Sequence, residues 1–149
     1  MKPTPPNWPR ISSAVFYVDP RKAIDWLCKA FGFTVRIVVD GPNGSVEHSE
    51  LGYGEGVVMV SSSQKSARGD HRRSPSQIAG GNTQSIMVYV DDVEAHCAQA
   101  RAHGAIIVSE PTTNDYGEEY WSDRTYETVD LEGHRWWFCE RLRSPANTD

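Results

Sequence analysis

His48 and Glu50 lie two residues apart in the segment 45–51. Of the pairs of side chains in this sequence, they have the widest range of possible chemical roles. Side chains alternate along a strand, so both would lie on the same face. An imidazole beside a carboxylate can hydrogen-bond a ligand, act in acid–base catalysis or take part in a metal site. A His-x-Glu pair on a strand also occurs on solvated faces. From the residues alone, all of these interpretations remain open.

Two further groups of side chains could contact a ligand. Trp121, Trp136 and Trp137 either pack in a core or form an aromatic wall on which a ligand stacks. Four basic residues gather in a polar segment and form either a solvated loop or a lid that recognises an anion: Lys65, Arg68, Arg72 and Arg73.

These side chains are carried by a sequence that repeats itself. Residues 13–35 align without a gap with residues 85–107, 72 positions later. The identical pairs include Ser13 with Ser85, Tyr17 with Tyr89, Asp19 with Asp91, and Gly32 with Gly104. A repeat of this length indicates two copies of one structural module.

Each copy begins with a strand and a helix. Short apolar runs at 15–18 and 86–90 are typical of buried strands. Asp19 before Pro20 predicts one helix start, and Asp91 with Glu94 three residues later has the pattern of a capping box. Gly32 and Gly104 stand where left-handed helix C-caps are expected.

The remainder of each copy is rich in β-formers. The pattern predicts three more strands in each copy, at 33–40, 45–51 and 57–61, and at 106–108, 118–128 and 135–139, with a polar loop at 111–117. The fold class is therefore α+β, with two tandem β-α-β-β-β modules at 11–61 and 83–141. A poorly ordered linker is expected at 62–82, chiefly near 64–77, with a proline-rich arm at 1–10 and a tail at 142–149. Two such modules would curve into one cupped domain whose cavity is the binding site.

Composition excludes several classes of partner. The 149-residue chain has a net charge of −5 and a pI of about 5.5, so it lacks the overall basic field of a nucleic-acid-binding protein. Its apolar runs are too short for a membrane span, and residues 1–10 lack the apolar region of a signal peptide. The three cysteines, Cys28, Cys97 and Cys139, have no paired spacing and indicate reduced packing groups in a cytoplasmic protein.

This arrangement resembles the vicinal oxygen chelate superfamily, which includes glyoxalase I, extradiol dioxygenases and bleomycin resistance proteins. The resemblance covers residues 11–141. It is carried by the two strand–Asp–helix openings and by the closing segment 126–138, where Leu131 replaces a usual proline. It implies homodimerisation, for which the proline-rich arm would be a natural strap.

The resemblance also identifies the positions of the family's metal ligands. Those positions hold Ser13, Met59, Ser85 and Trp137, none of which is a histidine or a carboxylate. Such a set is a poor site for a divalent ion, so we expect neither a bound metal nor another cofactor. In this respect the chain is similar to the bleomycin-resistance branch, whose members bind a ligand without catalysis.

The expected cup is lined by polar and aromatic side chains. Besides His48 and Glu50, the expected lining residues are Ser13, Tyr17, Met59, Ser61, Ser85, Met87, Tyr89, Trp121, Glu127 and Trp137. We expect a binding protein that sequesters a small aromatic or amine-bearing molecule, with cations preferred because of the charge of Glu50. The alternative is an enzyme without a metal, or with an unusual one, that acts as an isomerase, a lyase or a dioxygenase-like enzyme through His48 or Glu50.

Overall fold

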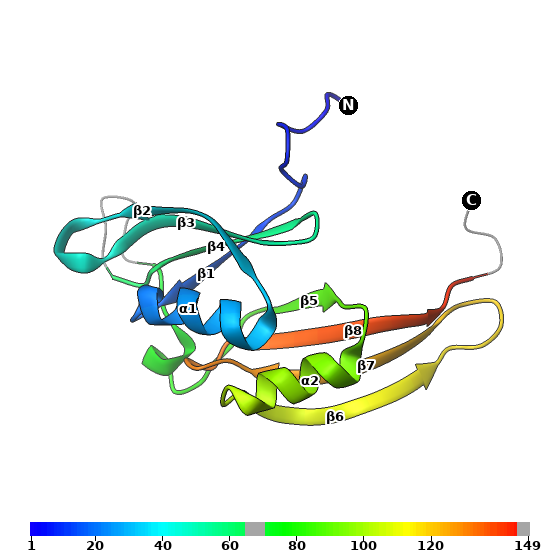
Figure 1. Ribbon diagram of the computed structural model, residues 1–149. Coiled ribbons are helices and arrows are strands. Elements are labelled where there is room, and N and C mark those ends of the chain that lie inside the picture. Colours follow the sequence, from blue (N-terminus) through cyan, green and yellow to red (C-terminus); the bar gives the residue numbers. More distant parts are fainter. Residues whose placement is uncertain (65–70, 146–149) are drawn as a thin grey trace. The chain divides into compact units, whose positions relative to one another are not determined.

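The computed structural model describes residues 1–64 and 71–145, so Lys65 and Arg68 lie outside the described residues. The chain divides into two compact units, residues 1–81 and 82–149, and each is described by itself (Figure 1). The first unit contains the proline-rich arm, the first module and most of the linker. The second unit contains the second module.

Unit 1 is a four-stranded mixed sheet with one long helix. Its elements are β1 (Ser13–Tyr17), α1 (Pro20–Phe31), β2 (Thr34–Asp40), β3 (Val46–Tyr53) and β4 (Gly56–Ser62), with short 3₁₀ turns at Pro42–Gly44 and Pro75–Gln77. The strand order is β1-β4-β3-β2, and β1 runs parallel to β4 while the other neighbours are antiparallel.

Unit 2 has the same plan. Its elements are β5 (Ser85–Tyr89), α2 (Val93–Ala102), β6 (Ile106–Asp115), β7 (Ser122–Val129) and β8 (Arg135–Arg143). The strand order is β5-β8-β7-β6, again with a parallel first pair. The predicted α+β class and the two tandem β-α-β-β-β modules are confirmed.

The helix α1 forms as its sequence predicts. The Asp19 carboxylate accepts a hydrogen bond from the Lys22 backbone N–H at 3.1 Å, and Pro20 occupies the first turn. Gly32 ends the helix with φ of +78°. The helix buries Leu27 and Phe31, among others, and packs against all four strands of its unit. Local capping and an apolar stripe together fix this element.

The start of α2 differs from the prediction by one residue. The N-cap is Asp92, whose side chain accepts from the Ala95 backbone N–H at 2.9 Å, so the capping box predicted at Asp91 is wrong. Glu94 instead forms an ion pair with Arg124. The two N-caps are thus 73 positions apart, whereas Gly32 and Gly104 are 72 apart, so the gapless alignment of the repeats fails within the helices.

We predict that Asp92→Ala lowers the free energy of unfolding by about 1 kcal/mol, because a buried helix loses its capping acceptor. Asp91→Ala is the matched control and should change it by less than about 0.5 kcal/mol. Urea unfolding followed by circular dichroism measures both. If the two variants lose equal stability, or if Asp91→Ala loses more, then Asp92 is not the cap and the alignment of the repeats at 72 positions holds.

Two strands of unit 2 are longer than predicted. β6 continues to Asp115 through the predicted polar loop, and its register shifts between Ser109 and Thr112, because Pro111 cannot donate to the ladder. β8 continues to Arg143, inside the predicted tail. Hydrogen bonds from the Arg143 guanidinium lower the pKa of Asp115 to about 2. An ion pair between the ends of two strands thus extends the sheet.

The described part of the linker is ordered. Ser74 and Gln77 form a capping box around the 3₁₀ turn Pro75–Gln77, and Ser74 is fully buried. The prediction of poor order is therefore wrong for residues 71–77. Serine-rich composition suggested a solvated linker, but the capping hydrogen bonds satisfy the local backbone.

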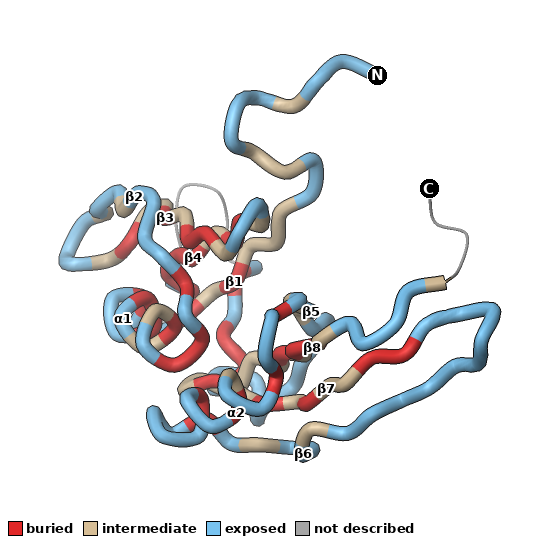
Figure 2. The backbone as a smooth tube through the Cα atoms, turned by 45° about the vertical axis from the view of Figure 1, so that its right-hand side comes forward, coloured by how far each residue is buried: buried red, intermediate tan, exposed pale blue. Residues whose placement is uncertain are grey.

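Each sheet has a buried face and an open face, and its edge strand, β2 or β6, is mostly exposed (Figure 2). In unit 1, the buried face carries Val15, Tyr17, Leu51 and Val60, all at 2% exposure or less. In unit 2, the buried face carries Tyr126, Trp136 and Phe138, and the ring of His96 on α2 lies 4.1 Å from that of Phe138. The helices thus cover one face of each sheet, and the opposite faces remain for ligands.

Candidate functional site

The open face of unit 2 gathers the expected residues of the second module. The register pairs Met87 with Trp137, Tyr89 with Cys139, and Glu127 with Trp137. Met87 is 56% exposed and Tyr89 46%. Ser85 lies on the same face, two residues before Met87. The shared face predicted for these side chains is confirmed.

An arginine missed by the sequence analysis organises this face. The Arg141 guanidinium lies 5.3 Å from the Tyr89 ring and 5.5 Å from the Trp121 ring, and its Nη2 donates to the Tyr89 hydroxyl at 2.5 Å. Asp123 accepts from the Nε of the same guanidinium. Arg141 follows Trp137 and Cys139 at alternate positions of β8, which was the available signal. It fixes two exposed aromatic rings in place.

The adjacent tryptophans of β8 have different roles. Trp136 is fully buried, and its indole Nε1 donates to Asp130 Oδ2 at 3.0 Å. Trp137 is half-buried on the open face. Core packing therefore describes Trp136, whereas Trp137 is available to a ligand.

The open face of unit 1 carries the histidine–glutamate pair. Glu50 lies opposite Met59, as predicted, and its Oε1 lies 3.1 Å from His48 Nε2. Its other oxygen lies 3.6 Å from Arg36 Nε. A β-bulge in β2 puts both Arg36 and Ile37 opposite Glu50, which brings the guanidinium onto this face. The carboxylate is thus flanked by two basic groups and is 16% exposed.

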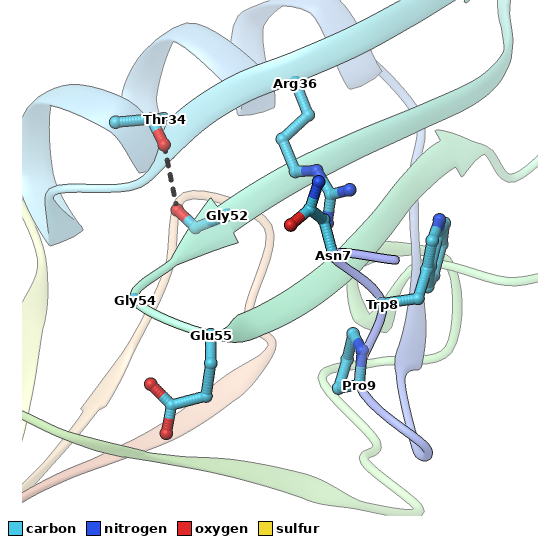
Figure 3. Close-up of a pocket in the computed structure, with 8 residues that line it drawn as sticks. All are labelled: Asn7, Trp8, Pro9, Thr34, Arg36, Gly52, Gly54 and Glu55. Atoms are coloured by element: carbon cyan, nitrogen blue, oxygen red, sulfur yellow. Dashed lines mark hydrogen bonds between the residues drawn. The ribbon is translucent and has the colours of Figure 1, made fainter. Parts of the chain in front are cut away.

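A pocket of about 560 Å³ is lined by Arg36, and the N-terminal arm forms one wall (Figure 3). Arg36 reaches from β2 toward Asn7 and Trp8, with its guanidinium 5.4 Å from the Trp8 ring. The lining also includes Thr34, Gly52, Gly54 and Glu55. The arm thus packs on its own unit, and its expected role as a strap for a partner stays a prediction.

Two expected lining residues of unit 1 lie on the wrong face. Ser13 pairs with Val58 and Tyr17 with Ser62, so neither shares the face of Met59, and Tyr17 is fully buried. The open face instead receives Ala14 and Phe16, which pair with Met59 and Ser61. The one-residue error in the repeat alignment explains this, because a shift of one reverses every side chain of a strand.

The position that corresponds to the family's metal ligand on the first strand is therefore Ser12 and not Ser13. Ser12 lies seven residues before the N-cap Asp19, as Ser85 lies seven residues before the N-cap Asp92. Its hydroxyl is buried without a hydrogen-bond partner among the described residues. With Met59, Ser85 and Trp137 at the other positions, the donor set still does not fit a divalent metal. Within residues 1–64 and 71–145, no three His, Cys, Asp or Glu side chains cluster as metal ligands do.

The cysteines offer no nucleophile to either face. Burial raises the pKa values of Cys97 and Cys139, and Cys139 also accepts a hydrogen bond from the Thr125 hydroxyl at 3.3 Å. Neither thiol is activated by a neighbouring base. Among the described residues, all three cysteines are free, in accord with their expected packing role.

Comparisons with known proteins agree with this architecture. The family model described as "Glyoxalase/Bleomycin resistance protein/Dioxygenase superfamily" matches residues 10–138. The uncharacterized protein Rv0887c of Mycobacterium tuberculosis is 29% identical over 135 residues, which span 91% of this chain and 76% of that protein. No helix in the described part of the chain is long and apolar enough to cross a bilayer.

Two solved structures are similar over most of the chain. TioX from Micromonospora sp. ML1 is 31% identical with a TM-score of 0.66, covering 89% of this chain and 98% of its own. TnmS3, an antibiotic binding protein from Streptomyces sp. CB03234, is 16% identical with a TM-score of 0.61, covering 87% and 93%.

Proposed function

Because the chain belongs to the glyoxalase/bleomycin resistance protein/dioxygenase superfamily, we propose that it binds and sequesters a small aromatic molecule without converting it. The observation that carries this proposal is the aromatic and thioether surface of unit 2, formed by the exposed Met87, Tyr89 and Trp121 and the half-buried Trp137. TnmS3, which shares the fold, is an antibiotic binding protein, and this supports the same class of role.

The surface has the physical properties of a stacking site. Rigid aromatic rings offer a large contact area at a low entropic cost, and Tyr89 and Trp121 are held further by the guanidinium of Arg141. Exposed apolar side chains gathered on one face of a sheet mark a binding site more often than scattered ones do. A planar ligand that stacks on these rings would displace the water that hydrates them.

The structure removes the reason for expecting a preference for amines. That expectation needed an uncompensated carboxylate, whereas Glu50 lies beside both His48 and Arg36. On the other open face, Glu127 forms an ion pair with Arg135 at 2.6 Å. Neither face offers a free negative charge among these groups, so the proposal specifies aromatic character and not a positive charge.

We predict that flat aromatic compounds change the tryptophan fluorescence saturably and are recovered unchanged. Trp137→Ala should weaken binding by about tenfold or more, because a stacking surface is lost. Trp137→Phe retains a ring and is the matched control. Calorimetric titration gives the affinities, and mass spectrometry of the recovered ligand tests conversion. If no aromatic compound binds, or if Trp137→Ala binds like the wild type, the proposal is wrong.

Catalysis by His48 and Glu50 is the second candidate function. The 3.1 Å contact between them favours it, since a paired imidazole and carboxylate can move a proton. An enzyme of this kind would convert its ligand and lose about 10²- to 10⁴-fold in rate on His48→Ala or Glu50→Gln. If the protein only binds its ligand, the ligand is recovered intact from the wild type, His48→Ala and Glu50→Gln alike. Homodimerisation and a cytoplasmic location remain predictions.

A further inference from the structure

Arg72 has a buried side chain and no counter-ion among the described residues. Its side chain belongs to a residue that is only 9% exposed, and its Nε is buried without a hydrogen-bond partner. No carboxylate of the described residues forms an ion pair with it. The acids of unit 1 that form ion pairs have other partners: Asp25 with Lys29, Asp40 with Arg21, and Glu50 with Arg36. A buried, uncompensated charge is costly, and such a group in a folded protein calls for an explanation.

The position of Arg72 provides one. Its guanidinium carbon lies 4.9 Å from the centre of the Phe16 ring, and Phe16 pairs with Ser61 on the open face of unit 1. The linker therefore brings the cation onto the open face of unit 1. The contact with an aromatic ring stabilises the guanidinium at this place, and its Nε is left without a hydrogen-bond acceptor among the described residues.

A second unpartnered donor lies at the same end of the sheet. Ser63 continues β4, with its backbone N–H donating to the Tyr17 carbonyl at 2.8 Å. The alternation along β4 puts Ser63 on the side of Ser61 and Phe16. Its residue is 3% exposed, and its hydroxyl is buried without a partner. A guanidinium and a hydroxyl that both lack an acceptor are complementary to an oxyanion.

We propose that the open face of unit 1 around Phe16 binds the carboxylate group of an aromatic acid, with Arg72 as its cationic anchor and Ser63 as a second donor. This inference rests on the proposed binding function and adds to it organic acids as a ligand class. A guanidinium binds a carboxylate through two parallel N–H groups, which lysine cannot reproduce.

The test uses the full chain, with sodium benzoate as the acid and benzamide as its neutral isostere, at constant ionic strength. Benzoate near saturation should raise the Tm of the wild type by about 3 °C or more, through binding to the folded state, and benzamide should not. Arg72→Met should abolish the benzoate shift, and Arg72→Lys should reduce it. Arg73→Met, at the exposed neighbouring residue, is the matched control and should keep the full shift.

Stability of the variants does not obscure the result. Arg72→Met removes an unpaired buried charge and keeps an aliphatic stem, so it should be at least as stable as the wild type without benzoate. An equal benzoate shift in Arg72→Met, or no shift in the wild type, would overturn the inference. If neutral aromatic compounds still change the tryptophan fluorescence in that case, the proposed binding function is supported although the carboxylate site is not.

Discussion

Replacement of Trp136 by alanine should lower the free energy of unfolding by about 3–5 kcal/mol, the range for loss of a large core side chain. The side chain is fully buried and stacks on Phe138 with ring centres 6.3 Å apart. The substitution also removes the hydrogen bond that the indole Nε1 donates to Asp130. Urea unfolding followed by far-ultraviolet circular dichroism measures the loss without depending on the removed fluorophore.

The adjacent residue is the matched control. Trp137 has the same side chain but lies on the open face of the same strand. Trp137→Ala should cost about 1 kcal/mol or less in stability, and it should act on ligand affinity instead. If the two variants lose equal stability, the assignment of buried and open faces in unit 2 is wrong.

Asp130→Ala should lower the free energy of unfolding by about 3 kcal/mol, because several buried donors lose their acceptor together. One carboxylate oxygen accepts from the backbone N–H groups of Glu132 and His134, each at 3.0 Å. The other accepts from the Trp136 indole at 3.0 Å, and Asp130 is 4% exposed. This single side chain joins the turn between β7 and β8 to the core.

Asp130→Asn separates the two parts of this effect. Its amide oxygen can still accept from the turn, but its NH₂ group would face the indole N–H, so the loss should be intermediate. Denaturant unfolding of the three proteins gives the order wild type, Asn, Ala. A loss below about 1 kcal/mol for Asp130→Ala would show that the turn does not depend on this carboxylate.

The module plan was predictable from sequence because its signals are local. Asp19, Pro20 and Gly32 bound α1 through contacts within a few residues, and the repeat supplied the second copy. The doublet Asp91–Asp92 put two aspartates side by side, and the N-cap is the second, not the Asp91 that the capping-box pattern with Glu94 indicated. The residues around the doublet do not show which aspartate is the cap. The choice sets the alignment of the two repeats, and therefore which residues of β1 are expected to share a face with Met59.

The candidate site was predictable only where strands alternate regularly. Ser85, Met87 and Trp137 follow such a pattern, and the register confirms their shared face. Arg36 reaches Glu50 through a bulge, and Arg72 reaches Phe16 from a linker. Neither bulges nor linker contacts have a periodic signal. The sequence named Arg72 only as one of four basic residues in a solvated loop or an anion-recognising lid, and its contact with Phe16, like that of Arg36 with Glu50, needed the structure.

The methionine methyl groups provide a direct test of where the ligand binds. The chain has three methionines: Met59 lies on the open face of unit 1, Met87 on that of unit 2, and Met1 is fully exposed at the N-terminal end. Met59→Leu and Met87→Leu assign the resonances of methyl-labelled protein by NMR. Titration with a neutral aromatic ligand should shift Met87 saturably and leave Met1 unchanged, and the Met59 resonance reports separately on unit 1. Saturable binding that leaves Met87 unshifted would contradict a site on the open face of unit 2.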